Sequence, residues 1–129
     1  MSGKYLLDTN IIISLFGDDV EIVAKVAKLD EIFIPVPVVG ELFFGAQKSL
    51  HVEDNIQRIN ELVESSTVLE CTIETAQHYG IIKKMLKDKG RPIPENDIWI
   101  AAIAREHGLI LVSQDGHFTH VDMIEMEKW

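Results

Sequence analysis

Residues 4–16 read KYLLDTNIIISLF, and this stretch predicts the kind of fold. Its first part, Lys4–Asp8, is a short apolar run typical of a buried strand, and Asn10–Phe16 continues as an apolar helix. Strands that are joined by helical crossovers lie parallel, because each crossover must return to the starting edge of the sheet. The stretch therefore predicts the first strand and helix of a parallel α/β sheet.

The same alternation of strand-like and helix-like patterns continues along the chain. Short apolar runs predict further strands at Glu31–Pro35, Thr67–Glu70 and Leu109–Ser113, with a weaker fifth pattern at Val121–Met126. Helical spacing predicts helices at Asp19–Asp30, Val38–Leu50, Val52–Ser65, Glu74–Lys89 and Glu95–His107, the last two ended by Gly90 and Gly108. We therefore expect an α/β/α sandwich with a central parallel sheet of four to five strands.

Length and composition exclude several classes of protein. The chain has 129 residues, room for one domain over residues 1–129, and its 47% hydrophobic content excludes disorder. Its net charge of −9 argues against nucleic-acid binding through a broad basic surface. No apolar run approaches the roughly 20 residues that span a bilayer, and Met1–Leu7 lacks the pattern of a signal peptide. We expect a cytoplasmic protein with no membrane partner.

Cys71 is the only cysteine, so the chain has no disulfide framework and no thiolate metal cluster. A single cysteine fits a reducing compartment. Because it stands at the end of an apolar run, we expect Cys71 to be a buried structural thiol.

Four carboxylates stand where the predicted fold allows both a structural and a chemical role. Asp8 follows the first strand and could cap the next helix, and Asp115 follows another strand in a DG turn. Asp97 falls in the first turn of a helix, where it could complement the helix dipole. Glu41 is the only charge within Val36–Ala46 and must either reach solvent at an edge or find a partner. Each residue alone leaves both roles open.

Taken together, the four carboxylates can converge on one edge of the sheet. The carboxyl ends of parallel strands share an edge, and ligands in such folds bind there. Carboxylates so close together repel one another, and a divalent cation removes that repulsion. Oxygen ligands without cysteine favour Mg²⁺ or Mn²⁺, which can activate a water molecule and neutralise charge on a phosphodiester.

Four blocks of the chain resemble the PIN-domain ribonucleases, and within them the VapC-type toxins of toxin–antitoxin pairs. The blocks are LLDTNIIISLF at 6–16, PVPVVGELFFGA at 35–46, NDIWIAAIAREHG at 96–108 and LVSQDGHF at 111–118. The resemblance implies a PIN-like fold and a metal-dependent endoribonuclease, in which water activated by Mg²⁺ or Mn²⁺ hydrolyses RNA to leave 5′-phosphate and 3′-hydroxyl ends. It makes Asp8, Glu41, Asp97 and Asp115 the catalytic metal-binding residues, supported by Thr9, Asn10 and Ser113.

One block departs from the family pattern. Ser113-Gln114-Asp115 stands where the family usually has Thr-Asn-Asp. Serine keeps the hydroxyl, but glutamine is longer than asparagine by one methylene, which bears on the position of Asp115.

The resemblance also implies partners. We expect a homodimer and a small antitoxin whose tail covers the acidic groove, often with a basic residue among the carboxylates. Phe16, Phe43, Phe44 and Leu50 are candidate anchors for the antitoxin, and at least two of them are expected in the core instead. Basic residues that could guide RNA precede the Asp97 helix, or else form a solvated helix end: Lys83, Lys84, Lys87, Lys89 and Arg91.

The sequence also allows comparison with other classes of protein that carry acids at strand ends. A haloacid-dehalogenase phosphatase needs a second acid two residues after the first, where this chain has Asn10, and a receiver domain would show paired acids at the first strand. His117 and His120 beside Asp115 suggest a transition-metal site, but two surface histidines explain them as well. The alternative from another class is a non-catalytic PIN-like module that binds RNA or a basic tail in its acidic cleft.

Overall fold

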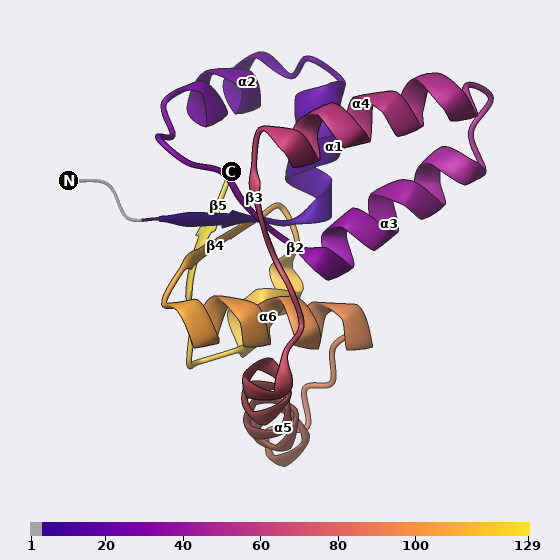
Figure 1. The fold of residues 1–129 in the computed structure, drawn as a ribbon. Helices are drawn as coiled ribbons and strands as arrows, with labels where there is room; N and C mark the ends of the chain where they lie inside the picture. The colour runs from indigo at the N-terminus through magenta and orange to yellow at the C-terminus, as the bar shows by residue number, and fades with distance from the viewer. Residues whose placement is uncertain (1–3) are drawn as a thin grey trace.

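The central sheet consists of five parallel strands in the order β3-β2-β1-β4-β5, in a computed structural model that describes residues 4–129 (Figure 1). The strands are β1 (Tyr5–Leu7), β2 (Phe33–Pro35), β3 (Thr67–Leu69), β4 (Ile110–Ser113) and β5 (Glu125–Lys128). This confirms the predicted α/β fold with a parallel sheet. Residues 1–3, which belong to the segment considered above for a signal peptide, lie outside the described residues.

The strand order reverses at β1, and this places the candidate site. The chain runs outward from β1 to β2 and β3, then returns to the other side of β1 with β4 and β5. The crevice beyond the carboxyl ends of β1 and β4 is therefore the switch point at which such folds bind ligands. Leu7 pairs with Val112 in the β1–β4 register, so that Asp8 and Ser113 follow at matching positions.

The fifth strand was predicted too early. Val121 is buried, but it follows a 3₁₀ helix, η1 (Gly116–His120), and the strand itself begins only at Glu125. β5 reads EMEK, with three charged and exposed residues, because it pairs on one side only and forms an edge of the sheet. Such an edge strand has too few apolar residues to be recognised by its pattern.

Helices cover both faces of the sheet. In Figure 1, α1 (Thr9–Phe16), α2 (Val20–Ala27), α3 (Val36–Gln47) and α4 (Val52–Glu64) lie above it, and α5 (Ile73–Asp88) and α6 (Glu95–His107) lie below it. Residues 100–104 of α6, which read IAAIA, are all buried because the helix lies between the sheet and α5. The small alanines allow that close approach. The layers match the predicted sandwich.

Local sequence signals explain the helix ends. Thr72 and Thr75 form a capping box at the start of α5. Gly108 ends α6 with a positive φ of 63°, a conformation that glycine adopts without strain. Cys71, just before the capping box, is exposed, so the prediction of a buried thiol was wrong. No helix within residues 4–129 is long and apolar enough to cross a membrane.

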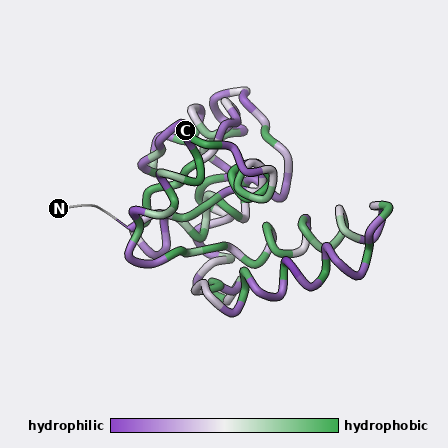
Figure 2. The backbone as a smooth tube through the Cα atoms, turned by 90° about the horizontal axis from the view of Figure 1, so that it is seen from above, coloured by the Kyte–Doolittle hydropathy of each residue, from purple (hydrophilic) through white to green (hydrophobic). Residues whose placement is uncertain are grey.

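Helices α3 and α4 pack against each other and extend away from the sheet. Figure 2 shows hydrophilic and hydrophobic residues alternating along this protruding pair. α3 buries Leu42 and Ala46, and α4 buries Ile59 and Leu62. The pair thus builds a small apolar extension of the core beside the switch point.

Candidate metal centre

Asp8 is the buried centre of the candidate site. Its side chain is 5% exposed, and it lies between the end of β1 and the start of α1. The backbone N–H of Thr9 donates to Oδ1 at 2.8 Å, and the Ser113 hydroxyl donates to Oδ2 at 2.6 Å. Both carboxylate oxygens are therefore held in place, one by the helix that follows and one by the neighbouring strand.

Asn10 connects the two sides of the switch point. Its Nδ2 donates to Ser113 Oγ at 3.3 Å, and its Oδ1 accepts from the Gln114 backbone N–H at 3.1 Å. Ser113 Oγ also accepts from the Asp115 backbone N–H at 2.9 Å. Ser113, which is fully buried, thus links Asp8 directly to the loop that carries Asp115.

The long side chain of Gln114 does not displace Asp115. Its Nε2 donates to Ser14 Oγ on α1 at 3.2 Å, so the extra methylene leads away from the carboxylates. The backbone N–H of Gln114 still bonds to Asn10, which fixes the loop. The departure from the usual family tripeptide is therefore accommodated at the surface of α1.

The imidazole of His117 lies close to the carboxylates of both Asp97 and Asp115. His117 Nδ1 lies 3.2 Å from Asp97 Oδ2 and 3.0 Å from Asp115 Oδ2. Asp97 comes from the first turn of α6, whereas Asp115 is the N-cap of η1. One ligand atom from each of these three side chains lies within 4.8 Å of the others, a spacing that could hold a metal ion. The sequence alone allowed His117 to be a surface histidine or part of a transition-metal site. Its position directly after Asp115-Gly116 was the signal that it could lie near the acids.

Glu41 lies in the second turn of α3, half-buried, and approaches the site from the β2 side. Asn96 of α6 donates to its Oε1 at 3.4 Å, which joins α3 to the helix that carries Asp97. Glu41 is not part of the group formed by Asp97, Asp115 and His117. It acts on the site through its charge, as the pKa of Asp8 shows.

Two of the four acids, Asp8 and Asp97, have raised pKa values. Burial raises the pKa of Asp8 above its usual range despite its two hydrogen bonds, and the charges of Glu41 and Asp115 raise it further. Burial also raises the pKa of Asp97 to about 6; the hydrogen bond from His117 opposes this rise, and the charges of Asp8 and Asp115 add to it. Asp8 is therefore coupled electrostatically to the other three acids, and the ionised forms of Asp8 and Asp97 are disfavoured.

The donor set fits a divalent cation. Carboxylate oxygens dominate it, as a hard ion such as Mg²⁺ or Mn²⁺ requires, and no lysine or arginine within residues 4–129 forms an ion pair with the four acids. Thr9 adds a second sign, since its buried Oγ1 has no hydrogen-bond partner in the described chain. Buried hydroxyls normally find a partner, so the atom is available to a water or ion at the site.

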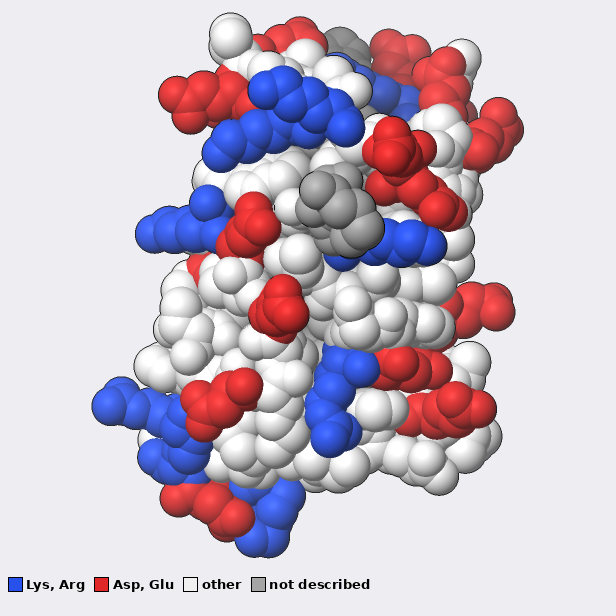
Figure 3. Space-filling view, turned by 90° about the vertical axis from the view of Figure 1, so that its left-hand side faces the viewer, with Lys and Arg blue, Asp and Glu red and all other residues white. Residues whose placement is uncertain are grey.

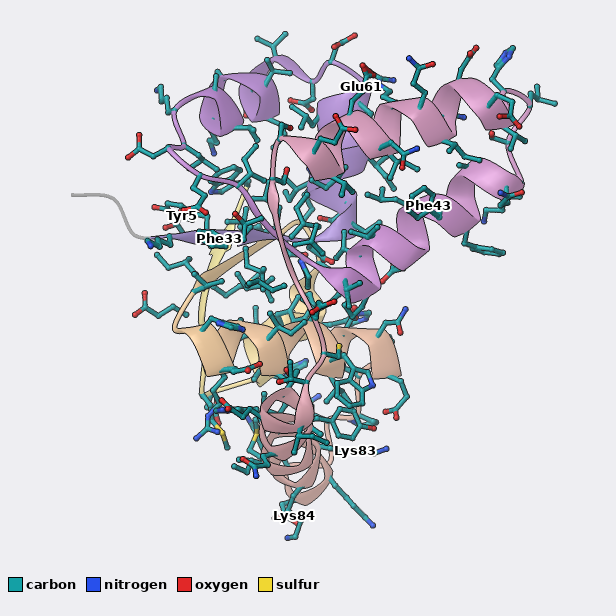
Figure 4. All side chains as sticks on the ribbon, viewed as in Figure 1. Tyr5, Phe33, Phe43, Glu61, Lys83 and Lys84 are labelled. Carbon is teal, nitrogen blue, oxygen red and sulfur yellow. The ribbon has the colours of Figure 1, made fainter. Side chains whose placement is uncertain are left out.

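The proposed RNA guide is less open than the sequence suggested. Lys83 pairs with Glu95, Lys84 with Asp88, and Lys89 with Asp122. Figure 4 shows Lys83 and Lys84 projecting outward from α5. On the face in Figure 3, acidic and basic side chains are interspersed rather than gathered by sign. Steering of RNA by this basic group stays a prediction.

The candidate antitoxin anchors divide into two pairs. Phe16 and Phe43 are partly buried and pack against the core, whereas Phe44 is 66% exposed and Leu50 is 96% exposed. Phe16 also lines a groove of about 260 Å³ between α1, α3 and α4, together with Ile13 and Glu41. An apolar groove therefore adjoins the acidic site, with Glu41 on its wall.

Comparison with known proteins agrees with this geometry. A family model for the PIN domain matches residues 5–123. Ribonuclease VapC2 of Haemophilus influenzae is 39% identical over 98% of both chains, and the tRNA(fMet)-specific endonuclease VapC of Shigella flexneri is 33% identical over 98% of both. The 2.2 Å structure of VapBC-1 from nontypeable Haemophilus influenzae superposes with a TM-score of 0.87, at 34% identity over 97% of both chains. The chain therefore belongs to the PIN-domain family, and within it to the VapC ribonucleases.

Proposed function

We propose that this chain is a metal-dependent endoribonuclease, the toxin of a VapBC-type pair, and that Asp8, Glu41, Asp97 and Asp115 are its catalytic metal-binding residues. The observation that carries the proposal is that Asp97 and Asp115 lie together with His117, and that the charge of Asp8 is coupled to the other three acids. Within residues 4–129 no lysine or arginine forms an ion pair with any of the four. An uncompensated acidic cluster repels RNA, so it can act on a phosphodiester only through a cation. Mg²⁺ and Mn²⁺ are the ions that the carboxylates favour.

Hydrogen bonds from neighbouring residues hold the carboxylates of the site in position. Thr9 and Ser113 keep Asp8 oriented through its two oxygens, and Asn10 holds the loop that carries Asp115. When bound, a divalent cation supplies a water molecule of lowered pKa and neutralises charge that develops on the phosphate. Preorganised carboxylates avoid reorganisation at the moment of reaction.

RNA is the proposed substrate because the relatives with full-length similarity are named as ribonucleases. The Shigella flexneri relative is named as specific for tRNA(fMet), and in this chain the loop beside the site carries Gln114 and His117. RNA nucleases of this size select folded or single-stranded targets by shape. A cytoplasmic location is part of the proposal, since such RNA is found there.

Cleavage by the purified chain tests the proposal. We expect purified wild-type protein to cut at least one of three RNAs, a tRNA pool, a ribosomal RNA fragment or a messenger RNA, in the presence of Mg²⁺ or Mn²⁺. The same preparation in EDTA should leave the RNA intact, and restored cation should restore cleavage. Denaturing gels with end-labelled RNA measure both. Intact RNA under every metal condition, or cleavage undiminished by EDTA, would contradict the proposal.

The groove beside Glu41 supports the antitoxin as partner. Ile13 is 59% exposed there, and a groove lined by Phe16 and Leu42 gives an apolar segment somewhere to bind. A segment lying in the groove would reach Glu41, where a basic residue can pair with the acids. The solved structure of VapBC-1 has the same fold as this chain, and the expected homodimer remains part of the proposal.

Introducing a charge into the groove should release the antitoxin. We expect Ile13→Lys to weaken binding of the small protein encoded by the neighbouring gene about 100-fold, because a lysine in an apolar groove loses both contact and desolvation energy. Copurification and inhibition of RNA cleavage measure the loss. Ile81→Lys is the matched control, since Ile81 is 46% exposed on α5 and does not line the groove. If the small protein inhibited RNA cleavage by Ile13→Lys and by Ile81→Lys equally, the antitoxin assignment would be contradicted. The lack of a neighbouring gene for a small protein would also argue against it.

A further inference from the structure

His117 lies where a cation ligand would lie. Its Nδ1 is 3.0 Å from Asp115 Oδ2 and 3.2 Å from Asp97 Oδ2, so a single nitrogen faces both carboxylates. Neighbouring ligands around an octahedral ion, each at about 2.1 Å from it, are about 3.0 Å apart. The nitrogen therefore already has the spacing of an adjacent ligand to each carboxylate oxygen, and one ligand atom from each of the three side chains lies within 4.8 Å of the others. To bind an ion, His117 Nδ1 would give up its hydrogen bond to Asp97.

The loop holds the imidazole in this position. The His117 backbone N–H donates to Asp115 Oδ1 at 2.8 Å, which turns the chain back toward the carboxylate. The next residue, Phe118, is 1% exposed and anchors η1 in the core. The backbone on both sides of His117 is therefore held, and the imidazole starts from a position fixed by the fold.

We propose that His117 binds the catalytic metal through Nδ1, beside Asp97 and Asp115, and that it shifts the metal preference from Mg²⁺ toward Mn²⁺. The inference rests on the proposed function, because it concerns the same metal. Imidazole nitrogen is a poorer ligand for Mg²⁺ than for transition metals, and Mn²⁺ accepts mixed nitrogen and oxygen donors more readily. On binding, Nδ1 presents its lone pair to the ion, and any proton it carries passes to solvent.

A different role for His117 would be that of a counter-charge. A protonated imidazole could neutralise the two carboxylates and bind no metal at all. The two roles differ in whether a nitrogen is bonded to the ion. That difference can be measured without an enzyme assay.

Pulsed EPR of Mn²⁺ added to the purified protein makes the distinction. We expect a ¹⁴N modulation from a directly bound imidazole in the wild-type protein and in His120→Gln, a control three residues along the same 3₁₀ helix. The modulation should vanish in His117→Asp, which keeps a ligand but removes the nitrogen. Circular dichroism confirms that the variants fold, and the wild-type spectrum alone can refute the idea.

Calorimetric titrations with Mg²⁺ and Mn²⁺ give the second readout. We expect His117→Asp to lower the preference for Mn²⁺ over Mg²⁺ by about tenfold or more, because its donors are then all oxygen. Mn²⁺ bound without ¹⁴N modulation, or an unchanged preference, would overturn the inference and leave the nuclease proposal in place. Absence of metal binding together with absence of RNA cleavage would overturn both.

Discussion

Replacing Asp8 by asparagine is expected to reduce RNA cleavage at least about 100-fold while leaving the fold intact. Asp8 is the most buried of the four acids, and both its oxygens are positioned by neighbours. Asparagine keeps the size and one acceptor oxygen, but it removes the negative charge that a cation would bind. Single-turnover cleavage rates at saturating Mn²⁺ measure the loss.

A matched control distinguishes the loss of a carboxylate at the site from the loss of a negative charge elsewhere on the protein. Asp30→Asn makes the same chemical change on an exposed residue. Asp30 precedes β2, so it lies near the amino end of that strand, whereas the site lies at the carboxyl ends. We expect it to cleave RNA at the wild-type rate. Cleavage by Asp8→Asn at a rate within a few-fold of that control would remove Asp8 from the proposed machinery.

The same substitution should not unfold the metal-free protein. Burial raises the pKa of Asp8, which means that the ionised form is costly in the folded state. Asparagine avoids that cost and can accept from Thr9 N–H as the carboxylate does. We therefore expect an unfolding temperature in EDTA equal to or above that of the wild type. Loss of activity then cannot be attributed to loss of structure.

The placement of the acids was predictable because a parallel sheet gathers strand ends. Asp8 directly follows β1, and Asp115 follows β4 after one further residue. Their convergence therefore required only that β1 and β4 be neighbours. Ser113 had to lie near Asp8 for the same reason, and the 2.6 Å hydrogen bond between them is its consequence. Local pattern and topology together place the carboxylates at one edge without any knowledge of side-chain contacts.

The contacts that depend on turn geometry were not predictable. His117 reaches Asp97 only because Asp115 caps a 3₁₀ helix of five residues, too short to leave a periodic pattern. Gln114 avoids the site by bonding to Ser14, and the length of glutamine alone gives no direction. Cys71 was expected in the core because an apolar run precedes it, but the chain turns there into the capping box of α5. Each of these three residues lies between the strands and α-helices of the sandwich rather than within one of them.

The net charge of −9 takes on a local meaning in this structure. On the face in Figure 3, acidic and basic side chains alternate as they do on an ordinary protein surface. The part that matters is the small group at the switch point, where burial, together with the charges of neighbouring acids, raises the pKa values of Asp8 and Asp97. A divalent cation there would place a positive charge among the carboxylates, which would reconcile an acidic protein with an anionic substrate.

Replacing Asp97 by asparagine should stabilise the metal-free protein and destroy its response to metal. Burial raises the pKa of Asp97 to about 6, against an ordinary value of 3.8. Between about pH 4 and pH 6 the folded state therefore holds a proton that the unfolded chain has released, so stability falls as pH rises through this window. At pH 7.5 the cost is fully present in the wild type and absent in the variant. We expect Asp97→Asn to be more stable in EDTA by about 1–2 kcal/mol.

Lowering the pH should remove that difference. As the pH falls from 7.5 through about 6, the wild-type carboxylate takes up its proton and becomes as neutral as asparagine. The two proteins should then unfold at similar denaturant concentrations near pH 4.5. Urea titrations at pH 7.5, 6.0 and 4.5 measure the difference. A variant that is less stable at pH 7.5, or a gap that widens in acid, would contradict the sign of the prediction.

Added metal should reverse the order of stability at pH 7.5. A ligand that binds only the folded state at 100 times its dissociation constant contributes about 2.7 kcal/mol, which exceeds the expected advantage of the variant. Mn²⁺ should therefore raise the unfolding temperature of the wild type above that of Asp97→Asn, which has lost a carboxylate from the group that includes Asp115 and His117. A change in fold alone cannot produce such a reversal, because it would shift both conditions in the same direction. Such a reversal would identify Asp97, the carboxylate that weakens the empty site, as one that the metal uses.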